Sequence, residues 1–405
     1  MTEVMRGVRI LEVAEHTFVP AASALLAEWG AEVIKVEHVE RGDAMRGLAS
    51  SGTVSLGDGV HVLLEHSNRG KQSLGLDLGS PDGLEVLHKL AATADVFLTN
   101  KTPSVRTKLK IDLDDIRGAN PDIIYVRGHG QGFRGPDADK GSYDSLAYWN
   151  RAGVALCSKP SDVDAVPNPP APAFGDSIGA MTIAGGIMGA LYHRATTGEA
   201  TTVDVSLMGV GIWSIGAAIA LSLQNDVPWK SLPTGGFSGN PLVTTYTTKD
   251  GKSLALTCLQ PGRYWAETCR LVGRPEAAED PRFADAPSIL TNGAAGREVL
   301  AAAFAEHTAA EWREILQPYT GQWALVQDTL EVAEDPQAIA NGYIADYESA
   351  DGVAFRLAAP PVRFGDEAPA RKRAPAFNEH GDQILEGLGL DMDQIIDLKV
   401  RGVVA

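Results

Sequence analysis

Short apolar runs alternate with stretches of helical periodicity over the first 130 residues. Val, Ile and Leu dominate the runs, which is typical of buried parallel strands. The runs lie at residues 8–13, 31–37, 73–78, 95–100 and 122–130. Helical spacing between them, at 20–30 and 81–94, completes a strand–helix–strand alternation. This alternation predicts a doubly wound α/β sheet.

A Pro-rich loop at 158–173 interrupts the alternation. We expect a long helix from Ser177 to about His193, a strand at 201–207 and a helical stretch to about 224. The apolar stretch around 203–223 contains Asp204, Ser206 and Trp213, so we interpret it as buried in the protein rather than membrane-spanning. No membrane partner is expected.

The pattern changes after residue 225. Two β-rich runs flank Lys249–Asp250–Gly251, which indicates a hairpin, and helical patterns follow at 263–272, 296–306 and 309–317. The sequence predicts a small α+β domain at 226–325 and a large domain formed by 1–225 with 326–405. The end of the chain is helical again.

Composition narrows the function classes. The net charge of −17 over 405 residues argues against a nucleic-acid partner, although local basic clusters can still bind anions. The three cysteines show no CxxC spacing, so neither a disulfide framework nor a zinc site is expected. The first residues lack the features of a signal peptide, which makes the cytoplasm the expected location.

One carboxylate, Asp176, stands between the Pro-rich loop and the predicted long helix. It could be the helix N-cap, accepting a backbone N–H. It could also be a nucleophile, with backbone N–H groups of the helix start holding an oxyanion beside it. The residues alone leave both interpretations open.

Two basic clusters adjoin predicted strands. Arg69 and Lys71 precede one strand, and Lys101, Arg106 and Lys108 follow another. Such residues often belong to solvated turns, but here they could form an anion site at the edge of the sheet. A standard dinucleotide site or P-loop is not expected, since neither GxGxxG after the first strand nor GxxxxGK[ST] occurs.

Two Gly-containing segments carry further alternatives. "TGGFSGN" at 234–240 could be a connection between domains or a mobile flap. His129, in "GHGQGFRGP", could serve as a general base, although a lone histidine in a Gly-rich turn is more often structural.

Several segments together carry a family resemblance, and they occur in the family's order. They are "GVRILEV", "GAEVIKVEHVERGDAMRG", "NRGKQSLGLDL", "DVFLTN", "NPDIIYVRGHGQGFRGP", "YDSLA", "GDSIGAMTIAGGIMGALYHRATTGEATTVDVSL", "NPLVTTYTTKDG" and "NEHGDQILEGLGL". The chain resembles the family III CoA-transferases, which include formyl-CoA transferase, carnitine CoA-transferase and the 2-methylacyl-CoA racemases.

The resemblance implies a fold and an assembly. The large domain would be Rossmann-like and completed by the C-terminal segment, and two subunits would interlock as a homodimer. Each active site would lie between the large domain of one subunit and the small domain of the other. Acyl-CoA and a carboxylic acid would be the substrates, with no permanently bound cofactor and no metal.

The resemblance also implies residue roles. Asp176 matches the family's catalytic aspartate, which attacks the acyl-CoA thioester to form a mixed anhydride. Gly235, Gly236 and Gly239 match a flap over that aspartate. The residues that would bind CoA are His16, Thr17, Phe18, His38, Arg69, Lys71, Asn100, Lys101, Arg106, Lys108 and Tyr143.

Departures from the family pattern bear on the substrate. Thr17 and His38 stand where formyl-CoA transferase has Gln and Arg, so a formyl/oxalyl substrate pair is not indicated. Tyr143 stands where the racemases have a catalytic His, which favours transfer of CoA over racemisation. A 2-methylacyl-CoA racemase and a non-catalytic CoA-binding subunit remain the alternatives.

Overall fold

A computed structural model describes residues 2–51, 54–56, 59–366 and 371–405. The chain divides into two compact units. The first comprises Met1–Ser158, Pro167–Trp229 and Ile339–Ala405, and the second comprises Lys159–Val166 and Lys230–Ala338. The second unit thus extends past residue 325, where the sequence pattern suggested its end.

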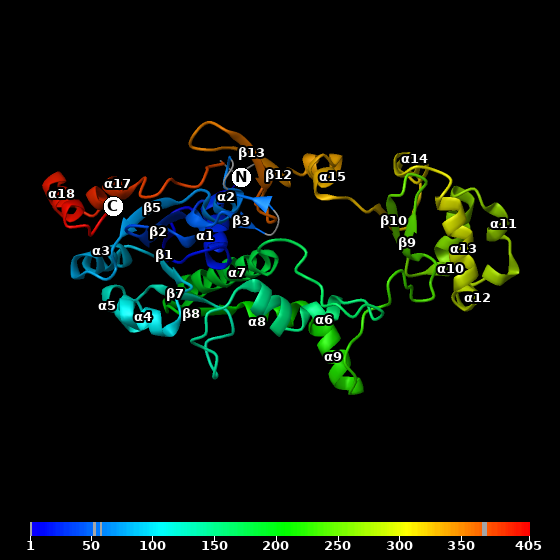
Figure 1. The fold of residues 1–405 in the computed structure, drawn as a ribbon, viewed down its shortest axis with the longest axis horizontal. Coiled ribbons are helices and arrows are strands. Elements are labelled where there is room, and N and C mark those ends of the chain that lie inside the picture. The colour runs from blue at the N-terminus through cyan, green and yellow to red at the C-terminus, as the bar shows by residue number, and fades with distance from the viewer. Residues whose placement is uncertain (1, 52–53, 57–58, 367–370) are drawn as a thin grey trace. The chain divides into compact units, whose positions relative to one another are not determined.

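A six-stranded parallel sheet forms the centre of the first unit (Figure 1). Its strands, in spatial order, are β5 (Gln72–Leu76), β2 (Glu32–His38), β1 (Arg9–Val13), β6 (Val96–Thr99), β7 (Ile124–His129) and β8 (Thr202–Ser206). The predicted α/β class with a parallel sheet is confirmed. Numbered along the chain, the order is 3-2-1-4-5-6, so the direction of winding reverses between β1 and β6. Ligands of such sheets bind at the carboxyl ends of the strands beside this reversal.

Helices cover both faces of the sheet. On one face, α1 (Phe18–Glu28) and α7 (Phe174–Thr197) pack on alternate residues of the strands, including Ile10 and Val126. On the other face lie α3 (Pro81–Ala92), α5 (Leu113–Ala119), α17 (Gly381–Gly387) and α18 (Met392–Val400). The C-terminal segment therefore closes the core of the first unit.

Helix α7 begins earlier than the sequence indicated. Its N-cap is Ala173, with φ of 56° and no side-chain capping bond, so Asp176 is the third residue inside the helix. The interpretation of Asp176 as the N-cap is therefore wrong. Ile183 and Ile187 are completely buried, and each contributes about 1.5–3 kcal/mol by leaving water.

Among the described residues, α7 is the one helix long and apolar enough to cross a membrane, judged by length and composition alone. Here it packs on α1 and the sheet as a core helix. The following helices, α8 (Leu207–Ser214) and α9 (Gly216–Asn225), meet at a 67° bend. The expectation that this stretch is buried holds for part of α8 but is wrong for α9, which contains no buried residue.

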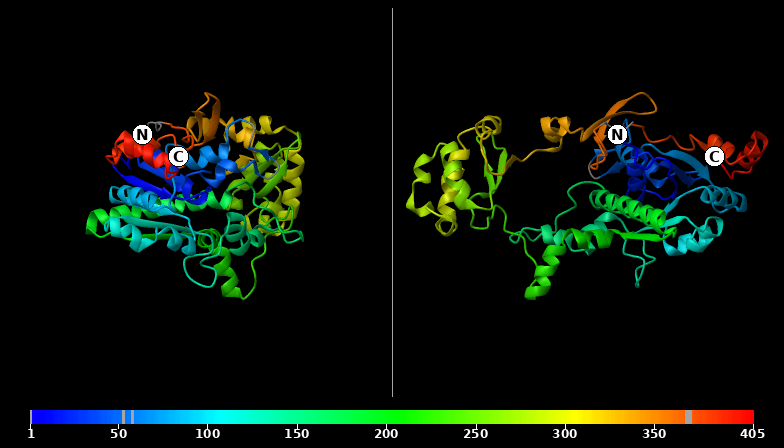
Figure 2. Two further views of the ribbon diagram at one scale, coloured as in Figure 1. Left: turned by 60° about the vertical axis from the view of Figure 1, so that its left-hand side comes forward. Right: turned by 180° about the vertical axis from the view of Figure 1, so that it is seen from behind.

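The second unit has a separate core. Strands β9 (Val243–Thr247), β10 (Ser253–Thr257) and β11 (Trp323–Leu325) form an antiparallel sheet, and the predicted hairpin between β9 and β10 is confirmed. Helices α10 (Pro261–Leu271), α13 (Gly293–Phe304) and α14 (Ala309–Ile315) cover it (Figure 2).

Short elements complete the chain. They are η1 (Ala44–Gly47), β3 (Ser50–Ser51), β4 (Val54–Ser55), α2 (Val62–Asn68), α4 (Pro103–Leu109), the π-helix η2 (Ser145–Arg151), α6 (Val154–Ser158), α11 (Pro275–Ala278), η3 (Pro281–Phe283), α12 (Ala286–Thr291), α15 (Thr329–Ala333), α16 (Pro336–Ala340), β12 (Ile344–Glu348) and β13 (Ala354–Ala358).

Candidate active site

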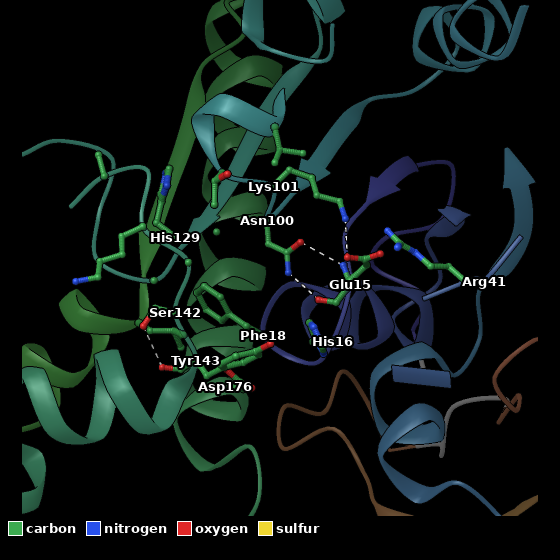
Figure 3. A pocket seen from close by; sticks show the side chains of 18 residues that line it. Glu15, His16, Phe18, Arg41, Asn100, Lys101, His129, Ser142, Tyr143 and Asp176 are labelled. Atoms are coloured by element: carbon green, nitrogen blue, oxygen red, sulfur yellow. Dashed lines mark hydrogen bonds and ion pairs between the residues drawn. The ribbon is translucent and has the colours of Figure 1, made fainter. Parts of the chain in front are cut away.

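A cavity of about 490 Å³ opens at the carboxyl ends of β1, β6 and β7 (Figure 3). Glu15 and His16 follow β1, and Asn100 and Lys101 follow β6. The Asn100 amide joins the two segments: its nitrogen donates to the Glu15 carbonyl at 2.7 Å, and its oxygen accepts the Glu15 N–H at 3.2 Å. The cavity thus lies at the reversal of the sheet, where ligands are expected.

Two glycines place Asp176 in this cavity. A Cβ on Gly175 would lie 2.5 Å from Cγ of Tyr148, so only glycine lets α7 begin against η2. A Cβ on Gly179 would lie 2.3 Å from Cε2 of Phe18, so glycine also lets the ring of Phe18 pack on the first turns of α7. The side chains of Phe18 and Asp176 both line the cavity as a result.

Asp144, the residue before η2, is attached to the start of α7. Its carboxylate accepts the Ser145 N–H at 2.7 Å and the Gly175 N–H at 3.2 Å. This second bond satisfies one of the N–H groups that a helix start leaves without partners. The Ser177 N–H is taken by the Ala173 carbonyl, so neither of these two N–H groups is free to hold an oxyanion.

The Asp176 carboxyl is held partly protonated. Burial and, secondly, the negative charge of Asp144 raise its pKa to about 7. No hydrogen bond or ion pair from the described residues reaches this carboxylate. An aspartate without partners and with a pKa near neutrality fits a reacting group better than a structural one.

A buried charge network holds the loop around His16. His16 has a φ of 68°, which is uncommon for a non-glycine residue, and its N–H donates to Asp43 at 3.0 Å. Asp43 in turn pairs with the completely buried Lys35 at 2.7 Å. The His16 ring meets the exposed ring of Tyr143 edge-on, at 5.5 Å between centroids. The network therefore fixes a strained loop that forms the edge of the cavity.

A second cavity of about 350 Å³ lies at the ends of β1, β2 and β5. Val36, His38 and Leu76 line it, together with Lys108 from α4. Both cavities share the residues Glu15, Arg41, Lys101 and Val105, so they adjoin. Together they offer a path along the edge of the sheet with several cations on its walls.

Most of the predicted CoA-binding residues are brought together here. His16, Phe18, Asn100, Lys101 and Tyr143 line the first cavity, and His38, Lys101 and Lys108 line the second. Their binding role stays a prediction. Lys101 is paired with Glu15 at 2.6 Å, so an incoming anion would compete with that carboxylate.

The other four predicted CoA-binding residues do not line either cavity. Thr17 is buried at the start of α1, and Arg106 donates to the Lys101 carbonyl at 2.8 Å. Arg69 pairs with Glu28 at 2.9 Å, and the buried ammonium of Lys71 pairs with Glu12 at 2.8 Å. The contacts of Arg69, Lys71 and Arg106, and the burial of Thr17, give these residues structural positions in this conformation.

Gly235, Gly236 and Gly239 lie in the second unit, and Gly235 and Gly239 have φ of 65° and 89°. Their function as a flap stays a prediction.

Some cavity residues were missed by the sequence analysis. Arg41 belongs to the quoted segment "HVERGDAMRG", so its position after the second strand was a usable signal. Lys140 gave no such signal, because only the folding of its loop brings it to the cavity.

Comparison with protein families gives one family for this chain. The model described as CoA-transferase family III matches residues 5–381.

Relatives and solved structures agree with that match. The chain is 29% identical to the (R)-2-hydroxy-4-methylpentanoate CoA-transferase of Clostridioides difficile, over 99% of each chain. It is 28% identical to the cinnamoyl-CoA:phenyllactate CoA-transferase of Clostridium sporogenes, over 98% of this chain and 96% of that protein. A crystal structure of a CaiB/BaiF family protein from Brucella suis superposes with a TM-score of 0.81 at 25% identity, covering 96% of this chain and 100% of that one.

Proposed function

The chain belongs to CoA-transferase family III, and from that membership we propose that it moves CoA from an acyl-CoA to a free carboxylic acid through covalent intermediates on Asp176. One observation carries the assignment to this residue. The Asp176 carboxylate lines the cavity at the reversal of the sheet and has no partner among the described residues. It is therefore available to bond to a thioester carbon.

The reaction balances with Asp176 alone as nucleophile. An oxygen of its carboxylate attacks the thioester carbon, a C–O bond forms, the C–S bond breaks and CoA leaves as a thiolate. The thiolate attacks the aspartyl carbon of this mixed anhydride and releases the first acid. The incoming carboxylate then attacks the aspartyl thioester, and the thiolate takes its acyl group from the new anhydride. Each step converts one activated acyl compound, a thioester or an anhydride, into another of similar energy, so no single step has a large free-energy change.

The raised pKa of Asp176 suits this chemistry. A carboxylate is a weak nucleophile, and its nucleophilicity towards a carbonyl carbon increases as its pKa rises. At a pKa of about 7, a large fraction is still ionised near neutral pH. Burial and the nearby Asp144 therefore raise the reactivity of the carboxylate without removing its charge altogether.

We propose that CoA occupies both adjoining cavities. We assign the nucleotide to the cavity beside β2 and β5, where Val36 and Leu76 offer apolar contact. Arg41, Lys101 and Lys108 would face its phosphates. The pantetheine arm would then run through the shared residues towards Asp176.

We also propose that two copies associate as a homodimer. Tyr192, Trp213 and Leu223 are 73%, 86% and 80% exposed on the successive helices α7, α8 and α9, and a second copy would cover these large apolar side chains. In the interlocked arrangement expected from the resemblance, Gly235, Gly236 and Gly239 of one copy would cover Asp176 of the other. Light scattering coupled to gel filtration should give the mass of a dimer, and a monomer would refute this part.

A CoA-exchange assay tests the function. Acetyl-CoA or succinyl-CoA is mixed with a panel of acids, and new acyl-CoA species are read by mass spectrometry. Asp176→Asn should abolish exchange, whereas Asp164→Asn, in the exposed Pro-rich loop, should not. Deuterium uptake at the α-carbon without exchange would instead indicate a racemase. Exchange that survives in folded Asp176→Asn would contradict the proposed nucleophile.

A further inference from the structure

His129 holds a fixed position that the proposed reaction does not use. It ends β7, its side chain is 5% exposed, and it lines the same cavity as Asp176. Its Nε2 lies 2.9 Å from Oδ1 of Asp204 on the neighbouring strand β8. Arg127 donates two hydrogen bonds to the same carboxylate, of 2.7 and 2.8 Å. Arg127 and His129 thus both hold the Asp204 carboxylate in position. The carboxylate in turn sets the orientation of the His129 imidazole.

The bond to Asp204 determines which ring nitrogen carries hydrogen. Burial opposes ionisation of Asp204, but hydrogen bonds from His129 and Arg127 outweigh it and lower the pKa of this carboxyl. An ionised carboxylate can only accept, so Nε2 of His129 is the donor. In the neutral ring, Nδ1 is then an acceptor, and no described residue hydrogen-bonds to it.

The strand order places His129 at one end of the path. The second cavity lies on the side of β2 and β5, while β7 lies on the opposite side of the reversal. His129 and Asp176 both line the first cavity, and Figure 3 shows that their side chains come from separate parts of its wall. If the nucleotide occupies the second cavity, as the proposed function has it, the side near β7 receives the acyl group.

We propose that His129, oriented by Asp204, binds a hydroxyl group on the acyl substrate, so that this enzyme prefers hydroxylated carboxylic acids to their unsubstituted counterparts. The hydroxyl would donate to Nδ1. An unsubstituted chain would leave this acceptor without a partner once water is displaced from the cavity. Such a mismatch typically lowers kcat/KM about 10- to 100-fold.

Matched pairs of acids test this preference. The pairs are lactate with propionate, 3-hydroxybutyrate with butyrate, and 2-hydroxy-4-methylpentanoate with 4-methylpentanoate. In the native enzyme, kcat/KM should favour the hydroxylated member of at least one pair by about tenfold or more. His129→Leu should bring that ratio close to one, and His129→Gln, which keeps a polar atom, should retain part of it. His193→Leu, on the exposed part of α7, should leave the ratio unchanged.

Several results would overturn the proposal. One is an equal preference within every pair, and another is a preference that both His129 variants retain. A preference for succinate that both His129 variants lose would show an imidazolium binding a carboxylate instead of a hydroxyl. Circular dichroism establishes that each variant is folded.

Binding separates this inference from the proposed function. Calorimetry with Asp176→Asn compares the CoA thioesters of the two acids in each pair and needs no turnover. Tighter binding of a hydroxylated thioester that is lost with the additional His129→Leu change supports the hydroxyl site even if exchange is never detected. Equal affinity of the two thioesters in every pair contradicts the hydroxyl site even if exchange is rapid.

Discussion

Replacing Asp144 with Asn should move the pH dependence of the reaction to lower pH. The change removes a negative charge beside Asp176 and keeps one acceptor oxygen, so it retains one of the two bonds, to the start of η2 or to the start of α7, and loses the other. Asp176 has a pKa of about 7 against an ordinary 3.8, a difference worth about 4 kcal/mol. Burial is the larger cause, so Asp144 accounts for at most about half of it, or about 2 kcal/mol. After solvent screening, removing the charge should lower the pKa by about one pH unit.

The assay is kcat/KM for CoA exchange between about pH 5 and about pH 9. The native enzyme should lose activity below about pH 7, as Asp176 becomes protonated. In Asp144→Asn this inflection should lie near pH 6, so the variant should be several-fold more active than the native enzyme at that pH. Asp164→Asn should keep the native inflection. An inflection that stays in place in folded Asp144→Asn, or moves to higher pH, would refute the proposed repulsion between the two carboxylates.

Three further changes test other parts of the account. Asp176→Asn should stabilise the protein at high pH: the folded-state pKa of about 7 exceeds the ordinary 3.8, so ionisation lowers the free energy of unfolding as pH rises between these values. Urea unfolding should show a gain of about 2–4 kcal/mol above pH 7 and almost none near pH 4, and a gain of equal size at both would count against the raised pKa. Gly179→Ala should cost about 1–3 kcal/mol and raise KM for acyl-CoA, because the new Cβ displaces Phe18; normal thermal stability with normal KM would contradict the packing. Lys71→Met should cost about 3–5 kcal/mol by leaving Glu12 with one cation fewer, and the folded fraction should bind CoA normally by calorimetry. Loss of CoA affinity at unchanged stability would instead show that Lys71 contributes to CoA binding.

The parallel sheet was predictable because its strands are buried on both faces. Such strands read as continuous apolar runs, and the runs at 8–13 and 31–37 coincide with β1 and β2 to within a residue or two. The start of α7 was not predictable in this way. It is set by a left-handed Ala173 and by contact of Gly175 with Tyr148, and neither follows local capping preferences.

The candidate site was predictable only where residues follow strands directly. Asn100 and Lys101 come straight after β6, so their place at the edge of the sheet follows from the topology. Lys71 was harder to place, because a sequence does not distinguish a lysine that awaits an anion from one already paired. The one available signal was Glu12, a carboxylate inside a buried strand, which requires a cation nearby.

The pairing of His129 with Asp204 depends on long-range register. The two residues are 75 positions apart and meet because β7 and β8 lie side by side, with Arg127 opposite Asp204. Only the three-dimensional arrangement turns an isolated histidine in a Gly-rich segment into an oriented ring at a cavity wall.

Isotope transfer to Asp176 tests the central claim most directly. When the incoming acid carries oxygen-18 in both carboxylate positions, the proposed steps leave one of its oxygens on the Asp176 carboxylate and the other in the new thioester. After several turnovers, peptide mass spectrometry should find the label in the peptide containing Asp176 and at no other aspartate. Rapid CoA exchange with an unlabelled Asp176 would show that the acyl group never bonds to this residue.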